Sequence, residues 1–423
     1  MLPKRHSKQA YLTRYIDYEL DELIEDLSGI GIDGPKGVGK TATASLRSDV
    51  VLALDDVAVR QVVEADAKRQ LTAKSVVCVD EWQNYPPVWD MVRRLIDDKV
   101  ATTFLLTGSA SPVVGTTTHS GAGRIISLRM RPLSLAERAG TQPTVFIRDL
   151  FEREADIAGN SDFSLSDYAT AICSTGLPGI YDLSPRARRA AIAGYVTRII
   201  DRDVPEQGGS VRRPDTLRSW LTAYAAASST TTTYTKILDA ATPADTDKIS
   251  KKTSDKYRDL LTKIWVLDSV PAWSPQALSL ARLNLSPKHQ LFDPGIAANL
   301  LGITDRTLVS AVKGTGEIFG QLFESLATLC VRTAGQAAEA RTFHLRTKAG
   351  EHEVDLILER YDGAVLAFEV KLSPTVDDKD VAHLHWLGEQ IGDHLVDKIV
   401  LTTGSTAYRR ADGVAVVPLA LLA

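Results

Sequence analysis

Cysteine is scarce in this sequence: Cys78, Cys173 and Cys330 are the three in 423 residues, and they lie far apart. They offer no CxxC pair and no disulfide framework, which is typical of a protein in a reducing compartment. Long hydrophobic runs are also missing, since the longest, residues 414–423, is too short for a membrane span and contains Pro418. We therefore expect a cytoplasmic protein with no membrane partner.

An excess of positive charge is absent as well. The chain has 49 Lys and Arg against 53 Asp and Glu, a formal net charge of -4, which argues against a histone-like binder of nucleic acid. Any nucleic-acid role would need a local basic surface. With 24% charged and 44% hydrophobic residues the composition is that of a globular protein, and the length predicts two to four domains of about 100–200 residues.

The pattern of apolar residues predicts an α/β multidomain protein with three units, 1–144, 145–305 and 306–423. In the first unit, short apolar runs at 75–79 and 104–106 flank a one-faced helix, the order of a βαβ crossover. The second unit has helical spacing, and its tract 228–234 (SSTTTTY) is predicted to be a loop. Strand patterns return in the third unit, at 353–358, 365–372, 398–402 and 414–419.

The first unit contains a complete G-x-x-x-x-G-K-T motif. Its glycines allow successive backbone N–H groups to point at phosphate oxygens, while the lysine reaches the β- and γ-phosphates and the threonine hydroxyl ligates Mg²⁺. The sequence therefore predicts ATP as the ligand and Mg²⁺ as the cofactor. The motif consists of Gly34, Pro35, Lys36, Gly37, Val38, Gly39, Lys40 and Thr41.

Two acidic residues end the strand at 75–79, about 40 residues after the P-loop. Asp80 is a candidate Mg²⁺ ligand and Glu81 a candidate general base for the attacking water. The alternative is a strand that ends in two solvated acids. One strand later, either Thr107 or Ser109 is a candidate sensor of the γ-phosphate.

Arg124 is a candidate arginine finger, because a guanidinium group can neutralise charge that develops on the transferring phosphoryl group. Arg129 and Arg131 compete with it for this role.

Four blocks of the first unit resemble the AAA-type P-loop ATPases of bacteria and archaea: GPKGVGKT, VVCVDEWQNYPPVWDMVRRLID, FLLTGSAS and GRIISLRMRPLSLAE. More narrowly, they are similar to a family whose C-terminal part is a domain of unknown function. The resemblance implies that Arg124 is the finger, acting in its own chain or in a neighbouring subunit. An oligomer is therefore left open.

The middle unit resembles the same family in a small-Gly-x-Pro turn at 174–178 and in a helix, 195–203, that ends in Arg-Asp. Residues 251–264 look like a helix of a winged-helix module, with Thr253 or Ser254 as its cap. Such a module contacts DNA in some proteins and is a structural lid in others. Its lysines are alternatively a solvated helix entry.

The third unit places Glu369 and Lys371 on one face of an otherwise apolar strand, which is costly unless they pair or do chemistry. Together with Asp355 one strand earlier and Glu324 in a preceding helix, they resemble the core of PD-(D/E)XK nucleases. The resemblance implies that Asp355 and Glu369 bind Mg²⁺, that Glu324 is a further metal residue on the helix, and that Lys371 orients or activates the attacking water.

The charge of this unit opposes a tight nucleic-acid binder. Residues 311–423 carry 11 Lys and Arg against 16 Asp and Glu, a formal charge of -5. Two hypotheses follow. In the first, ATP hydrolysis controls a metal-dependent nuclease that acts on DNA or RNA. In the second, the chain is an ATP-dependent switch whose inactive nuclease-like fold binds nucleic acid or a protein.

Overall fold

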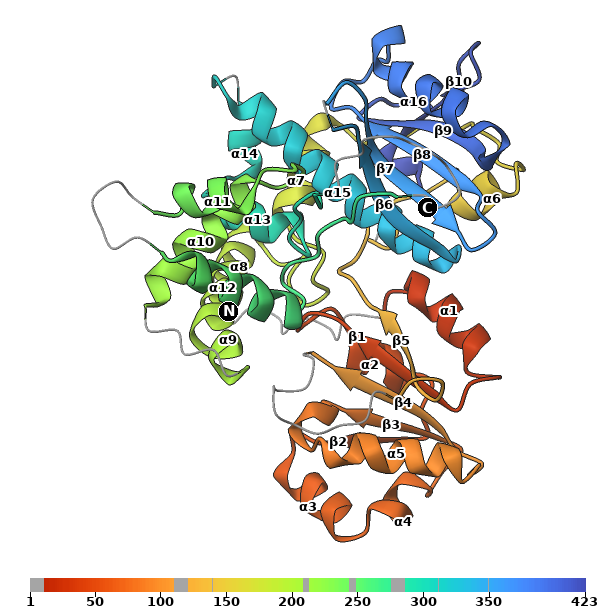
Figure 1. Cartoon of the computed structure of the whole chain (residues 1–423), viewed down its shortest axis with the longest axis vertical. Coiled ribbons are helices and arrows are strands. Elements are labelled where there is room, and N and C mark those ends of the chain that lie inside the picture. Colours follow the sequence, from red (N-terminus) through yellow and green to blue (C-terminus); the bar gives the residue numbers. More distant parts are fainter. Residues whose placement is uncertain are drawn as a thin grey trace, which may run out of the picture.

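The computed structural model describes residues 11–109, 121–138, 140–207, 213–242, 249–274, 286–310, 312–348 and 350–423. Two parts of unequal size are joined in the middle of the molecule (Figure 1). We call the smaller part, at residues 28–138, the P-loop lobe, and the larger part, which begins at residue 140, the upper body. Within the described ranges, no helix is both long and apolar enough to cross a lipid bilayer.

Five parallel strands form the sheet of the P-loop lobe, in the order β2-β3-β4-β1-β5. The sheet is apolar on both faces: Ile32 belongs to one hydrophobic cluster, with Ala44 of α2, and Phe104 belongs to another, with Val92 of α5. The βαβ prediction is confirmed as β3, α5 and β4. The strands are β1 (Gly29–Asp33), β2 (Val50–Ala53), β3 (Val76–Asp80), β4 (Thr103–Gly108) and β5 (Ile126–Arg129). The helices of the lobe are α2 (Lys40–Ser45), α3 (Val57–Ala65), α4 (Ala67–Leu71) and α5 (Pro87–Asp97), and α1 (Tyr15–Leu23) precedes the lobe in the chain.

Helices make up the first half of the upper body, as predicted, and the tract from residue 228 is a loop until α11 begins at Tyr234. The expected helix at 251–264 is α12, but its cap is Ser250, whose hydroxyl accepts from the Thr253 N–H at 3.1 Å. The elements are α6 (Ile147–Phe151), α7 (Leu165–Cys173), α8 (Pro185–Arg198), the π-helical turn η2 (Ile199–Asp203), α9 (Val204–Glu206), α10 (Pro214–Ala226), α11 (Tyr234–Ala240), α12 (Lys251–Lys263), α13 (Pro294–Leu300) and α14 (Asp305–Leu308).

A short antiparallel ladder follows α12. Its two limbs pair at Leu267 with Leu291 and at Val270 with Lys288, and the first limb then continues alongside His344 of β6. The ladder thereby joins the helical half of the upper body to the edge of its sheet. A winged-helix module stays a prediction.

The second sheet has six strands in the order β10-β11-β9-β8-β7-β6. Its central part follows the chain order helix, three antiparallel strands, helix, and a fourth strand that is parallel to the third. All four strands expected from the sequence are present. The elements are α15 (Thr315–Ala337), β6 (Ala340–Arg346), β7 (Glu353–Arg360), β8 (Val365–Val370), α16 (Asp378–Ile391), β9 (Leu395–Thr402), β10 (Tyr408–Arg409) and β11 (Ala415–Pro418).

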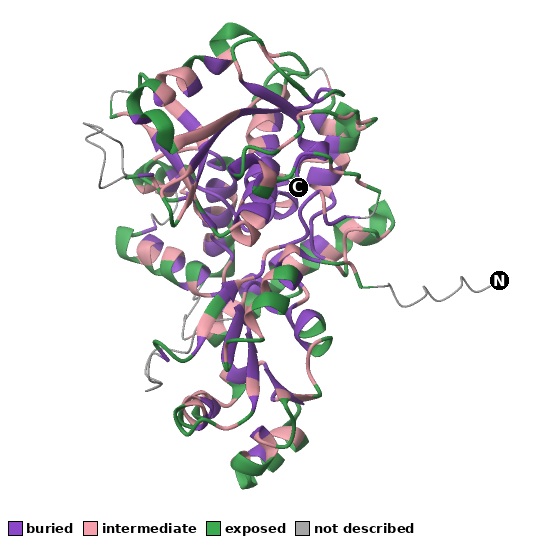
Figure 2. Ribbon diagram, turned by 90° about the vertical axis from the view of Figure 1, so that its right-hand side faces the viewer, coloured by how far each residue is buried: buried purple, intermediate pink, exposed green. Residues whose placement is uncertain are grey.

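One hydrophobic core continues from the helices of the upper body into its sheet, so that buried residues fill the interior of both (Figure 2). Ile172 of α7, Ile296 of α13 and Leu326 of α15 belong to this core. The last residues of the chain add to it, because the Ala423 N–H donates to the Val145 carbonyl at 2.8 Å.

Asp268, on the first limb of the ladder, holds the P-loop lobe against the upper body. Its carboxylate lies 2.8 Å from Arg131 Nε, which follows β5, and 3.3 Å from Arg332 Nη2 of α15. Arg129 of β5 is a third partner, at 4.0 Å, and its guanidinium group stacks over the Trp265 ring. Burial alone would raise the pKa of the Asp268 carboxyl, but the three arginines outweigh burial and lower the pKa well below its ordinary value.

Replacing Asp268 with Ala should lower the free energy of unfolding by about 3–5 kcal/mol, because it leaves three mostly buried guanidinium groups without their shared carboxylate. The effect persists at neutral pH, since a lowered carboxyl pKa means that the stabilisation is lost only on strong acidification. Urea titration followed by circular dichroism measures the loss. Asp255→Ala, which removes an exposed carboxylate on α12, is the matched control, and equal stability of the two variants would contradict the prediction.

Candidate active site

The P-loop lies between the carboxyl end of β1 and the start of α2. A side chain at Gly34 would place its Cβ atom 2.2 Å from the Met130 carbonyl oxygen. Gly39 has a φ angle of 108°, which favours glycine. Local geometry therefore requires glycine at both positions, and the whole predicted stretch from Gly34 to Thr41 forms this turn.

The Lys40 ammonium group is folded back into the loop that it follows. It donates to the carbonyl oxygens of Gly34 and Pro35, both at 2.9 Å, and the side chain is buried. Burial lowers the pKa of Lys40 to about 8, although Glu81 and Asp80 oppose this shift. The positive charge that the motif needs is thus held only below a mildly alkaline pH.

Asp80, at the end of β3, accepts hydrogen bonds from two hydroxyl groups. The Thr41 hydroxyl donates to Asp80 Oδ1 at 2.7 Å, and the hydroxyl of Thr107, at the end of β4, donates to the same oxygen. A carboxylate beside a hydroxyl group supplies the oxygen ligands that Mg²⁺ prefers, so these residues fit the predicted ion. Mg²⁺ would be held by Thr41 and Asp80.

Glu81 occupies the next position and has a left-handed backbone conformation, with φ at 50°. Its Oε2 atom accepts from the Ser109 hydroxyl at 3.1 Å and from the side-chain amide of Gln83. Ser109 therefore contacts Glu81, the predicted general base, whereas Thr107 contacts Asp80, the predicted Mg²⁺ ligand. Gln83 was missed from the sequence, although it lies two residues after the Asp-Glu pair.

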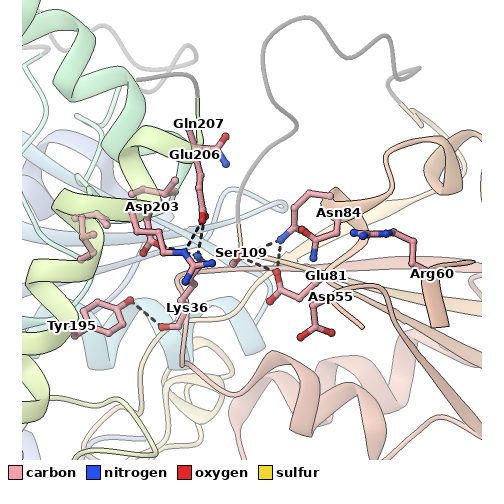
Figure 3. Close-up of a pocket in the computed structure, with 15 residues that line it drawn as sticks. Lys36, Asp55, Arg60, Glu81, Asn84, Ser109, Tyr195, Asp203, Glu206 and Gln207 are labelled. Carbon is pink, nitrogen blue, oxygen red and sulfur yellow. Dashed lines mark hydrogen bonds and ion pairs between the residues drawn. The ribbon is translucent and has the colours of Figure 1, made fainter. Parts of the chain in front are cut away.

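A cavity of about 510 Å³ opens in front of Glu81, between the P-loop lobe and the upper body (Figure 3). Glu81 and Ser109 line it from the P-loop lobe, and Tyr195 and Asp203 line it from the upper body. Lys36 of the P-loop bridges the two sides. Its ammonium group lies 2.6 Å from Asp203 Oδ1, and its carbonyl oxygen accepts from the Tyr195 hydroxyl at 2.9 Å.

Arg124 lies at the other end of the sheet. It precedes β5, which runs parallel to β1, whereas the P-loop follows β1. Its Nε atom pairs with Asp97 Oδ1 at 2.7 Å, at the end of α5. The structure therefore does not bring Arg124 to the P-loop of its own chain. Arg129 lies at the end of β5 nearer the loop, where it is held by Asp268 and Trp265.

The acids of the second sheet surround a lysine that the sequence did not suggest. The Lys288 ammonium group, fully buried, lies 2.7 Å from Glu324 Oε1 and 3.1 Å from Asp355 Oδ1. Glu353 Oε1 is a third neighbour, at 3.7 Å. Burial alone would lower the pKa of Lys288, but Glu324 and Asp355 outweigh it and raise the pKa, so the group stays charged.

Glu369 and Lys371 pair with each other, with 3.4 Å between Oε2 and Nζ. The other oxygen of Glu369 is buried without a hydrogen-bond partner, and burial raises the pKa of this carboxyl well above its ordinary value. In the described part of the chain, no group of three His, Cys, Asp or Glu side chains could hold a metal ion. The expected Mg²⁺ site at Glu324, Asp355 and Glu369 stays a prediction, and in the structure a lysine contacts two of these three acids.

The affinity for ATP should fall as the pH rises through about 8, since Lys40 then loses the charge that attracts phosphate. Above that pH the dissociation constant should rise up to about tenfold per pH unit. Calorimetric titration in buffers from neutral to alkaline pH measures this dependence. Lys40→Arg should remove it, because arginine stays protonated throughout. A pH-independent affinity in the wild type would contradict the prediction.

Models of known protein families match most of the chain. Residues 28–139 match the model of an AAA domain, and residues 165–307 and 319–422 match two domains of unknown function, DUF8612 and DUF4143. A search of the curated proteins finds no match. The N-terminal match confirms the expected similarity to AAA-type ATPases, and the last match is to a C-terminal domain of unknown function, as the narrower resemblance implied. The P-loop lobe is therefore similar to an AAA domain, which indicates a P-loop ATPase.

Proposed function

We propose that this chain is a Mg²⁺-dependent ATPase that works as a switch, with a C-terminal unit that binds a nucleic-acid or protein partner without cutting it. The observation that carries the ATPase is the arrangement around the P-loop. Asp80 is bonded to Thr41, and Glu81 is held by Ser109 at the wall of a cavity between two parts of the molecule. Thr41 and Asp80 would hold the Mg²⁺ that accompanies ATP, and Glu81 would be the base that hydrolysis needs.

Each residue has a defined task in the proposed reaction. Backbone N–H groups of the P-loop and the Lys40 ammonium bind the phosphates, and bound Mg²⁺ would neutralise charge on the β- and γ-oxygens. Glu81 accepts a proton from water as the water oxygen bonds to the γ-phosphorus. The bond from that phosphorus to the bridging oxygen breaks, and ADP leaves.

The location of the cavity supports a switch. A nucleotide in it touches both the P-loop lobe and the upper body, so its loss changes contacts between the two. Lys36 makes such contacts already, through Asp203 and Tyr195. A ligand shifts a conformational equilibrium by the difference in its contacts with the two states.

Lys288 supports the second hypothesis for the C-terminal unit over the first. The chain order of α15, β6, β7, β8, α16 and β9 agrees with a PD-(D/E)XK core. An ammonium group between Glu324 and Asp355, however, supplies the positive charge that a nuclease obtains from a divalent cation. We propose that the fold is retained and that the acids stabilise it by binding Lys288.

Glu81→Gln tests the ATPase. It should lower the rate of phosphate release by about 10²- to 10⁴-fold, because the amide cannot accept the proton from water. The affinity for ATP should change little, since phosphate binding depends on the P-loop. Glu64→Gln, on the exposed face of α3, is the matched control. Unchanged turnover in Glu81→Gln would refute the role of this residue as the base.

The C-terminal proposal is tested by incubating the wild type with supercoiled plasmid DNA or with RNA, in the presence of Mg²⁺ or Mn²⁺. No cleavage is expected. Nicking that disappears in Asp355→Ala would contradict the proposal and restore the nuclease hypothesis. Lys288→Ala should lower the free energy of unfolding by about 3–5 kcal/mol, since it leaves the mostly buried carboxylates of Glu324 and Asp355 without their counter-ion. A Lys288→Ala variant as stable as the wild type would show that the lysine is not their counter-ion.

A further inference from the structure

The Arg-Asp end of the helix at 195–203 has no task in the reaction described so far, yet it lies at the nucleotide cavity. Asp203 forms the 2.6 Å ion pair with Lys36 of the P-loop. Arg202, beside it, lines the same cavity as Glu81 and Ser109. Arg202 and Asp203 therefore approach the P-loop from the upper body, opposite Glu81, the proposed general base.

Arg202 belongs to η2, a π-helical turn between α8 and α9. Such turns are rare and frequently occur at functional sites, because the extra residue re-aims neighbouring side chains. Ile199 and Ile200 of the same turn are buried in the core of the upper body, which fixes its backbone. Arg202 itself is 70% exposed, so its side chain has room to move within the cavity.

The ion pair between Arg202 and Glu206 is weak, so another anion can take the place of Glu206. It joins Arg202 Nε to Glu206 Oε1 at 2.7 Å, one helical turn along the chain, and the Glu206 side chain is 48% exposed. Exposed pairs with this spacing contribute little to stability. A phosphate group offers the planar guanidinium group two oxygen atoms at once and a higher charge, so a triphosphate in the cavity competes well with a single carboxylate.

Glu206 also lies 3.7 Å from the Lys36 ammonium. Asp203 and Glu206 thus neutralise two cations, Lys36 and Arg202, that border the space in front of the P-loop. Each of these two positive side chains therefore has a carboxylate partner at the cavity.

We propose that Arg202 contacts the triphosphate of ATP from within the same chain and stabilises the charge that develops on the γ-phosphoryl group, while Glu206 holds Arg202 back until ATP binds. The inference rests on the proposed ATPase activity. It assigns to Arg202 the role that the sequence suggested for Arg124, which lies at the far end of the sheet.

Arg202→Ala in the full chain should lower kcat for ATP hydrolysis by about 10²- to 10³-fold, as the loss of a group that stabilises the transition state does. The dissociation constant for ATP, measured in the Glu81→Gln background, should change much less. Arg198→Ala is the matched control, because Arg198 is an exposed arginine one turn earlier that does not line the cavity. Thermal melting shows whether each variant is folded.

Glu206→Gln separates this role from a structural one. If Arg202 acts on phosphate, Glu206→Gln frees it, so KM should fall and kcat should be kept. If the pair only stabilises α9, both substitutions should impair the enzyme equally, and that result would overturn the proposal. So would an Arg202→Ala variant with the kcat of the wild type.

The ATPase itself is tested separately with Lys40→Ala, which should abolish turnover. Turnover that is lost in Lys40→Ala but kept in Arg202→Ala refutes the role of Arg202 and leaves the ATPase standing. A wild type without ATP turnover refutes the proposed function and, with it, this inference.

Discussion

The charge cluster on Asp268 is the interaction on which the relation between the two parts of the molecule depends. One mostly buried carboxylate binds Arg131 and Arg129 from the P-loop lobe and Arg332 from α15 of the upper body. Three guanidinium groups repel one another, so this junction is stable only with the carboxylate at its centre. The cavity in front of the P-loop, with walls from both parts, keeps its shape because the junction holds them in register.

The features that the sequence predicted well are local. The P-loop, the Asp-Glu pair and the βαβ crossover are each defined by residues close together along the chain, where spacing determines geometry. Thr107 and Ser109 were alternatives because residues 105–109 carry no sign of which hydroxyl faces which acid. Thr107 lies at the end of β4 and Ser109 just after it, which brings Thr107 to Asp80 and Ser109 to Glu81.

The features that the sequence did not predict depend on distant residues. Lys288 lies 36 residues before Glu324 and 67 before Asp355, and no spacing rule connects it with them. The contacts of Lys36 with Asp203 and Tyr195 likewise join residues that are far apart in the sequence and lie on opposite walls of the cavity. Arg124 is a different case, since parallel strands place a residue that precedes β5 at the end of the sheet opposite the P-loop. The direction of β5, taken together with the position of the P-loop after β1, is therefore enough to place Arg124 away from the P-loop of its own chain.

Asp268 and Lys288 lie on the two limbs of one short ladder, which is held by hydrogen bonds between Asp268 N–H and the Gln290 carbonyl and, in both directions, between Val270 and Lys288. Paired backbones slide past each other only by breaking such bonds, so the ladder acts as a rigid spacer of fixed length. One end is anchored in the arginines beside the P-loop lobe, and the other in the acids of the second sheet. The ladder thereby couples the two ionic centres through the backbone, so a shift of one of them would be passed to the other.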